Sequence, residues 1–172
     1  MKKYILLILL FPILCFSYDR SDWKHWIDED KDCQNTRAEI LIERSLSKIE
    51  YSSNKCTVKS GSWTDFYTGE TLFNASDIDI DHVVPLKHAD ELVGNIWTRD
   101  QKKKFANDPM NLIITYKKFN RQKGAKTISE WLPSNKTNAC RYIKRWMLVK
   151  QKYNLPISID EKKSQKFLKD CN

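Results

Sequence analysis

The stretch Asp77–Leu86, which reads DIDIDHVVPL, combines a strand pattern with a reactive pair of side chains. Its isoleucines alternate with aspartates, and an apolar–polar alternation with a period of two indicates a β-strand with one buried face. Pro85 has no N–H to donate and ends the extended segment. The stretch therefore predicts that Asp81 and His82 stand next to each other near the end of a strand.

A second informative stretch, Asn111–Gly124, reads NLIITYKKFNRQKG. Its apolar, β-rich first half predicts a strand over residues 111–116. Its basic second half predicts a short helix over residues 117–123 that Gly124 closes. Asn120 and Lys123 lie three positions apart, so a helix places both side chains on one face.

These two stretches contain the groups that hydrolysis of a phosphodiester requires: a general base, ligands for a cation, and a donor to the phosphate oxygens. His82 is neutral near physiological pH and can act as the base. Asp81 is a hard oxygen ligand that suits magnesium, and Asn120 supplies a second, neutral oxygen.

The combined pattern resembles the HNH endonucleases of the ββα-metal superfamily. The matching residues are Asp79-x-Asp81-His82-Val-Val-Pro85, then Asn111-Leu, then Asn120-x-x-Lys123-Gly. The resemblance covers roughly residues 22–171 of the sequence. It implies an α+β fold in which a ββα-metal core, at about residues 76–126, is surrounded by further helices.

The resemblance also implies a role for each matching residue. Asp81 resembles the first metal ligand, and Asn120 resembles the second, in place of the final histidine that names the family. His82 resembles the base that activates water, and Asn111 resembles the residue that fixes the loop and orients this histidine. Lys123 resembles a phosphate contact. The cofactor expected is one divalent ion, Mg²⁺ or alternatively Mn²⁺, and DNA is the substrate expected ahead of RNA, which stays open as the alternative.

Three further groups of residues are candidates for a function. Arg37 and Arg121 are candidates for binding the substrate. Asp79 falls on the same strand face as Asp81 and either supports the site or caps a loop. The acids at positions 28, 30, 32 and 39 have the spacing of a calcium-binding loop, but Cys33 stands where that loop needs glycine for its sharp turn.

The N-terminus has the pattern of a secretory signal peptide over residues 1–17: two lysines, an apolar run from Tyr4 to Phe16, and Ser17 at the expected cleavage point. The run is too short to span a bilayer comfortably. A retained membrane anchor and a lipid anchor through Cys15 are the alternatives. The sequence thus predicts a protein exported to the periplasm or beyond the cell, without stable membrane association after cleavage, and one domain over residues 18–172.

Four cysteines remain after this leader, Cys33, Cys56, Cys140 and Cys171, and an even number in an exported chain predicts two disulfides. Three pairings are possible, and we favour Cys33–Cys56 with Cys140–Cys171 because each pair is adjacent in sequence. The chain carries 30 Lys and Arg against 22 Asp and Glu. This basic balance suits a polyanionic partner such as nucleic acid, although simple solubility would also account for it.

The pattern elsewhere predicts a helix over residues 36–49 that opens with a capping box of Thr36 and Glu39. Strands and turns are predicted over residues 55–75, a helix from Thr98 with a second capping box, and a long helix over 137–153. The function predicted is a secreted, metal-dependent endonuclease of little sequence specificity. The alternatives are a non-catalytic, basic nucleic-acid-binding module, and a hydrolase that uses the same centre on another substrate.

Overall fold

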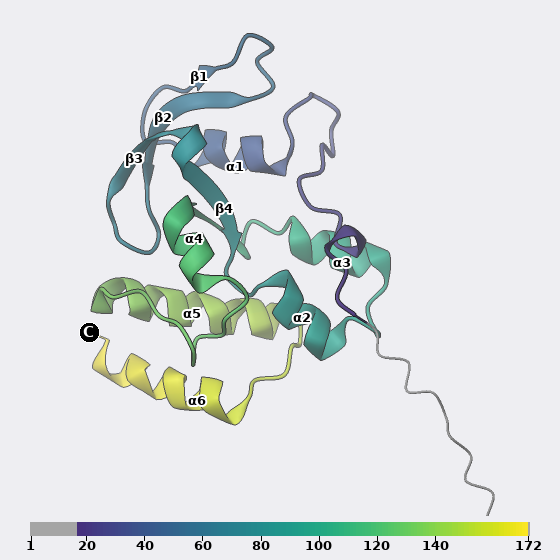
Figure 1. Ribbon diagram of the computed structural model, residues 1–172, viewed down its shortest axis with the longest axis vertical. Helices are drawn as coiled ribbons and strands as arrows, with labels where there is room; N and C mark the ends of the chain where they lie inside the picture. Colours follow the sequence, from purple (N-terminus) through teal and green to yellow (C-terminus); the bar gives the residue numbers. More distant parts are fainter. Residues whose placement is uncertain (1–16, 172) are drawn as a thin grey trace, which may run out of the picture.

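The strand predicted around Asp81 forms β4, Ile78–His82, and pairs antiparallel with β5, Leu112–Tyr116. Ile78 lies opposite Tyr116, and His82 lies opposite Leu112. Helix α4, Lys117–Lys123, follows β5 directly and packs on both strands (Figure 1). Gly124 ends α4 with a φ of 55°, which glycine adopts without the steric cost of a Cβ. The predicted strand, helix and closing glycine are thus confirmed.

The computed structural model describes residues 17–171. The predicted signal peptide lies outside this range except for Ser17. Within the described residues, no helix has both the length and the apolar character needed to cross a membrane.

A second sheet of three antiparallel strands stands beside this pair, in the order β1 (Glu50–Tyr51), β2 (Val58–Thr64) and β3 (Thr71–Asn74). A 3₁₀ turn, η2 (Ala75–Asp77), joins β3 to β4. Helix α1, Thr36–Glu43, packs against the same region. The smaller of two hydrophobic cores lies between α1 and these strands, and the alternation in β4 directs Ile78 and Ile80 into it. Asp79 and Asp81 therefore belong to the opposite face of the strand.

Helix α1 is shorter than predicted, and its capping differs. It ends at Glu43, and the side chain of Asn35 accepts the capping hydrogen bond from the Ala38 N–H. The Thr36 hydroxyl donates to the carbonyl of Ile27 instead, so the predicted capping box of Thr36 and Glu39 is wrong. The capping box of Thr98 and Gln101 is confirmed at the start of α3, Arg99–Ala106.

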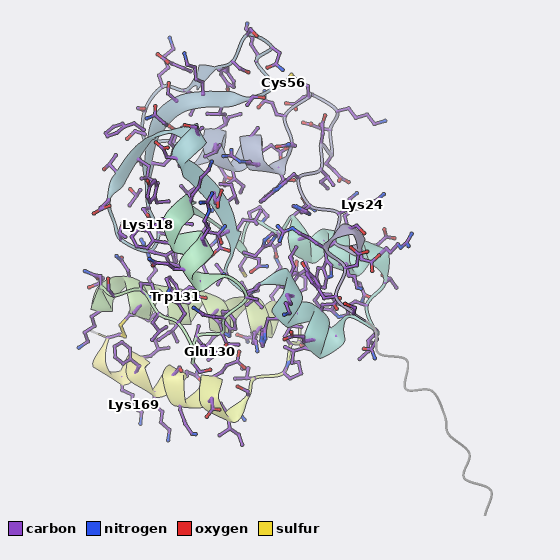
Figure 2. The ribbon with its side chains drawn as sticks, in the orientation of Figure 1. Lys24, Cys56, Lys118, Glu130, Trp131 and Lys169 are labelled. Carbon is purple, nitrogen blue, oxygen red and sulfur yellow. A yellow bond between two sulfur atoms is a disulfide. The ribbon has the colours of Figure 1, made fainter. Side chains whose placement is uncertain are left out.

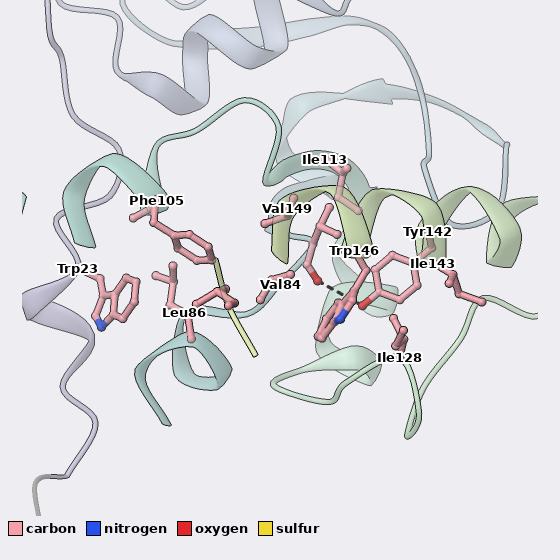
Figure 3. Close-up of a cluster of buried hydrophobic side chains, with 14 of the residues drawn as sticks. Trp23, Val84, Leu86, Phe105, Ile113, Ile128, Tyr142, Ile143, Trp146 and Val149 are labelled. Atoms are coloured by element: carbon pink, nitrogen blue, oxygen red, sulfur yellow. Dashed lines mark hydrogen bonds between the residues drawn. The ribbon is translucent and has the colours of Figure 1, made fainter. Parts of the chain in front are cut away.

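The larger core lies among α2 (Leu86–Val93), α3 and the long helix α5 (Lys136–Lys152). Figure 3 shows aromatic and aliphatic side chains meeting there, with Trp23 entering from the N-terminal segment that holds the 3₁₀ turn η1 (Arg20–Asp22). Trp23, Phe105 and Trp146 have no exposed surface. This core holds the N-terminal segment and α2 beside the end of β4.

Two disulfides tie the ends of the chain to this framework. Cys33 bonds to Cys56, and Cys140 of α5 bonds to Cys171 after α6 (Ile159–Lys166) and the turn η3 (Phe167–Asp170). The favoured pairing is therefore confirmed. The bonds close loops of 23 and 31 residues, and loop-closure entropy puts their stabilisation at about 3 to 4 kcal/mol each.

Candidate active site

A pocket of about 310 Å³ opens where the end of β4, the start of α2, the last turn of α4 and the N-terminal segment meet. Asp81, His82 and Asn120 all line it, although they are separated by up to 39 positions in the sequence. A larger surface hollow of about 840 Å³ lies elsewhere, but it does not bring an acid, a histidine and an amide together. Chemistry rather than size therefore identifies the candidate site.

Asp81 is buried, and both of its carboxylate oxygens are held by hydrogen bonds. The Tyr67 hydroxyl donates to Oδ2 at 2.6 Å, and the Lys123 ammonium lies 3.1 Å from Oδ1 and 3.0 Å from Oδ2. Burial raises the pKa of Asp81, while Lys123 and Tyr67 act to lower it. The carboxylate is thus fixed in one orientation.

The structure places Lys123 differently from the prediction. Its side chain has no exposed surface, and its ammonium also donates to the carbonyl of His82 at 2.9 Å. It does not line the pocket. The ammonium of Lys123 is bonded to Asp81 and to the His82 carbonyl, and its predicted contact with phosphate stays a prediction.

His82 is buried, with one ring nitrogen bonded to the protein. Its Nε2 lies 2.8 Å from the carbonyl oxygen of Ala106. A carbonyl only accepts, so Nε2 carries the hydrogen of the neutral ring and Nδ1 keeps its lone pair. Trp26 stacks on the ring at a centroid distance of 5.9 Å.

His82 is uncharged at neutral pH. Burial lowers the pKa of His82 to about 3, and the nearby charges of Arg20 and Lys123 act in the same direction. The ring is therefore neutral at neutral pH, with a proton on Nε2 and a free lone pair on Nδ1.

Asn120 reaches the pocket from α4, and Asp79 fixes its amide. The Asn120 Nδ2 donates to Oδ2 of Asp79 at 3.0 Å. A carboxylate can only accept here, so the amide oxygen of Asn120 is the atom left for another partner. Asp79 thus supports the site, which decides between the two roles that the sequence left open for it.

Asn111 acts on the backbone rather than in the pocket. Its Oδ1 accepts from the Val84 N–H at 2.8 Å, its Nδ2 donates to the Val84 carbonyl at 3.2 Å, and its own carbonyl accepts from the Val83 N–H at 2.7 Å. These bonds fix the two residues that follow His82. Asn111 has no exposed surface and positions the histidine without lining the site.

The two arginines predicted to bind substrate do not line the pocket. The Arg37 guanidinium donates to the carbonyls of Ala75 and Ile78, at 3.0 and 2.9 Å, and so holds the start of β4. Arg37 thus contacts the backbone of the fold, and its predicted role in substrate binding stays a prediction. Arg121 is exposed on α4, outside the pocket.

Two pocket contacts were not predicted from the sequence. Tyr67, from the turn between β2 and β3, bonds to Asp81, and the carboxylate of Asp65 anchors this turn to β5 through the Thr115 hydroxyl and the Tyr116 N–H. Arg20 lines the pocket from the N-terminal segment. Neither residue belongs to a motif, and only the folded chain brings them to the site.

The oxygen donors of the pocket fit a small divalent cation. The Asp81 carboxylate and the free amide oxygen of Asn120 are hard ligands, which Mg²⁺ and Mn²⁺ prefer over softer sulfur or nitrogen. Asp79, Tyr67 and Lys123 orient these ligands in the way that hydrogen bonds commonly support metal sites.

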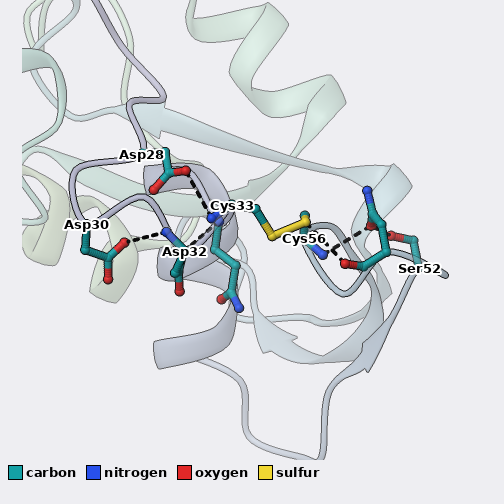
Figure 4. Close-up of a disulfide and its surroundings, with 8 residues drawn as sticks. Asp28, Asp30, Asp32, Cys33, Ser52 and Cys56 are labelled. Atoms are coloured by element: carbon teal, nitrogen blue, oxygen red, sulfur yellow. Dashed lines mark hydrogen bonds between the residues drawn. A yellow bond between two sulfur atoms is a disulfide. The ribbon is translucent and has the colours of Figure 1, made fainter.

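A second acidic group, which does not line this pocket, lies beside the disulfide of Cys33 (Figure 4). Oxygens of Asp28, Asp30 and Asp32 lie within 4.8 Å of one another. Cys33 adopts a φ of 77°, so the cysteine does reach the left-handed backbone for which the calcium-loop pattern uses glycine. All three acids are exposed, and we assign no metal to them.

Comparison with known proteins finds one matching family and a relative of similar sequence. The model of the family described as "GmrSD restriction endonucleases, C-terminal domain" matches residues 22–165. A protein of Arthroderma benhamiae named "Uncharacterized secreted protein" is 37% identical over 147 residues, which cover 84% of this chain and 71% of that protein. No solved structure matches the sequence.

Proposed function

The chain belongs to the family of GmrSD restriction endonuclease C-terminal domains, and we propose that it is a metal-dependent endonuclease. The observation that carries this proposal is the convergence of Asp81, His82 and Asn120 on one pocket. Pure binding of nucleic acid does not need a buried neutral histidine beside oxygen ligands. We assign the site to the HNH type, with β4, β5 and α4 as its ββα-metal core.

In this proposal His82 is the general base. Its Nε2–H bond to the Ala106 carbonyl fixes the ring, and Nδ1 accepts the proton of the attacking water. Asn111 holds the backbone after the histidine, so the ring keeps its place through the reaction. General-base catalysis of this kind contributes on the order of 10² to 10⁴ in rate.

Asp81 and Asn120 would hold the cation, one Mg²⁺ or Mn²⁺ ion. When bound, such an ion supplies positive charge that stabilises the phosphate and the leaving oxygen. Tyr67 and Lys123 keep the Asp81 carboxylate in place, and Asp79 does the same for Asn120. Lys123 is a positioning residue in this assignment and does not contact the substrate.

The proposed substrate is DNA, cut with little sequence preference, because the basic charge is spread over the surface. Figure 2 shows Lys24, Lys118 and Lys169 on separate parts of the molecule, and all three are exposed. We also propose export, with residues 1–17 as a signal peptide. The relative named as a secreted protein supports this, as do the two disulfides, which form in oxidising compartments.

The test is cleavage of supercoiled plasmid and of RNA by the disulfide-bonded protein, in Mg²⁺ and in EDTA. We expect nicking of plasmid in Mg²⁺, none in EDTA, and a loss of at least about 100-fold in Asn120→Ala, since it removes a metal ligand. Gln122→Ala is the matched control, because Gln122 is exposed on the same helix outside the pocket.

Two results would overturn parts of this proposal. DNA binding without cleavage in Mg²⁺ or Mn²⁺ would favour a non-catalytic binding module. Cleavage of RNA but not of DNA would show that the proposed substrate is wrong, and the roles proposed for the pocket residues would stand.

A further inference from the structure

Beside the proposed cation, the motif residues place no positively charged side chain in the pocket. In phosphodiester hydrolysis, negative charge grows on the non-bridging oxygens, and a positioned cationic donor stabilises it. Lys123 cannot serve, because its buried ammonium is bonded to Asp81 and to the His82 carbonyl. Arg37 cannot serve either, because its guanidinium is bonded to backbone carbonyls of η2 and β4.

Arg20 is placed where that charge is needed. It lines the same pocket as Asp81, His82 and Asn120, and it is exposed. Within residues 17–171, it takes part in no salt bridge. Among the described residues, Arg20 thus adds to the pocket a positive charge that no carboxylate pairs with in a salt bridge.

The backbone that carries Arg20 is firmly held. The Asp19 carboxylate accepts from the Ser21 N–H at 2.8 Å, and the Trp23 N–H donates to the Arg20 carbonyl at 3.1 Å. Trp23 is fully buried against Trp97 and Phe105, and its indole N–H donates to Asp90. An arginine on an anchored turn loses less freedom on binding than one on a free terminus.

Lys87 is the other cationic side chain among the described residues of this pocket, and it suits the role less well. Its ammonium lies 3.9 Å from the carboxylate of Glu91 on the same helix. A lysine also offers a point charge, whereas a guanidinium can donate two parallel hydrogen bonds to two oxygens of one phosphate.

We propose that Arg20 forms a phosphate-binding subsite of the pocket and contacts the non-bridging oxygens of the phosphodiester that is cut. This inference rests on the proposed function. It gives the N-terminal segment a direct part in substrate binding, although that segment lies about 60 residues before the Asp81-His82 pair in the sequence.

The first test measures catalysis by Arg20→Ala, Arg20→Lys and Lys24→Ala on a short DNA duplex. We expect kcat/KM to fall on the order of 100-fold in Arg20→Ala, with part of the loss restored in Arg20→Lys. Lys24→Ala is the matched control, because Lys24 is exposed on the same segment and does not line this pocket. Thermal unfolding should be unchanged in all three variants, since both side chains are exposed.

The second test measures DNA binding without cleavage, in a His82→Ala background with and without Arg20→Ala. One lost phosphate contact should reduce the slope of log K against log salt by about 0.9. An equal loss in Lys24→Ala, or an Arg20→Ala variant with wild-type kcat/KM and salt slope, would overturn the subsite.

These outcomes separate the two proposals. Wild-type cleavage with no effect of Arg20→Ala removes the subsite and leaves the nuclease. An inactive wild-type protein whose salt slope still depends on Arg20 removes the nuclease and leaves a phosphate-binding residue. A wild-type protein that neither cleaves nor binds DNA overturns both.

Discussion

Two buried carboxylate–lysine pairs in this molecule make the same kinds of contact but have different surroundings. Asp81 pairs with Lys123, and Glu161 of α6 pairs with Lys150 of α5. Each carboxylate also accepts a hydrogen bond from an aromatic side chain, at 2.6 Å from the Tyr67 hydroxyl and 2.8 Å from the indole of Trp146. In both pairs the lysine side chain has no exposed surface.

The two pairs differ in what surrounds their carboxylates. Asp81 lines a pocket beside His82 and Asn120. Glu161 is enclosed: it caps its own helix at Ser158, and His88 lies 3.6 Å away. A buried ion pair therefore does not by itself identify a functional site. The pair at the proposed site differs from the structural pair because it borders a pocket that also holds a histidine and a second oxygen ligand.

The two carboxyl groups also differ in ionisation. Burial raises the pKa of Asp81. Burial acts in the same direction on Glu161, but the nearby His88 ring, the Lys150 ammonium and the hydrogen bond from the Ser158 N–H outweigh it and hold the pKa of Glu161 well below its usual range. The Glu161 carboxyl thus ionises more readily than a free glutamate, whereas burial disfavours the charge of Asp81.

The largest expected effect is on catalysis by Asp81→Asn. The change removes the charge that would hold the cation, so we expect the cleavage rate in Mg²⁺ to fall about 10³-fold or more. Single-turnover cleavage of a duplex at saturating enzyme measures it, with circular dichroism to show that the variant is folded. Cleavage by Asp81→Asn at the wild-type rate would show that Asp81, like Glu161, is not needed for catalysis.

Glu161→Gln makes the matched change at the enclosed pair. It leaves the Lys150 ammonium buried without its counter-ion, so we expect the free energy of unfolding to fall by about 3 kcal/mol. Denaturant titration measures this loss, and kcat/KM at 25 °C should stay within about two-fold of wild type because the pair lies away from the pocket. A loss of activity with unchanged stability would reverse the roles assigned to the two pairs.

Tyr67→Phe removes one hydrogen bond to Asp81 and keeps the ring in the core. Because partners of metal ligands tune affinity, we expect the half-saturating Mg²⁺ concentration to rise about 10-fold or more. Calorimetric titration of the ion gives a readout separate from activity. In Trp146→Phe, the counterpart at the enclosed pair, the Mg²⁺ affinity should not change, and an equal shift in both variants would point to a general loss of packing.

The smallest expected effect is on the pH dependence of stability. A carboxyl whose pKa is lowered by folding stabilises the protein above its ordinary pKa, and this contribution is lost as the pH falls through the lowered value. For Glu161 the loss begins below about pH 4.5. The stability difference between wild type and Glu161→Gln should therefore shrink between pH 5 and pH 3, and a constant difference would show that Glu161 is not the group responsible.

Local signals predicted much of this molecule. The alternation in residues 77–82 and the pattern of residues 111–124 predicted β4, β5 and α4. This was possible because the period of a strand and the glycine that ends a helix depend on residues close together in the sequence. The same stretches indicated Asp81, His82 and Asn120, which share the pocket. Both disulfides followed from the order of the cysteines.

Contacts between distant segments were not predictable in this way. A helix position shows which face carries Lys123, but not that this face is buried against Asp81. Tyr67 comes to the site because a turn packs there, and Arg20 because the N-terminal segment packs there, and no spacing in the sequence encodes either contact. The helix predicted over residues 36–49 stopped at Glu43, and apolar periodicity alone did not place that end.

The central claim is that His82 is the base of a hydrolytic pocket, and His82→Ala tests it most directly. The measurement is the single-turnover rate of duplex DNA cleavage in Mg²⁺ at pH 7.5, for wild type and variant, with and without imidazole. We predict a fall on the order of 10³ in the variant and partial recovery with imidazole, which can take the place of the missing ring. Cleavage by His82→Ala at the wild-type rate would contradict the account.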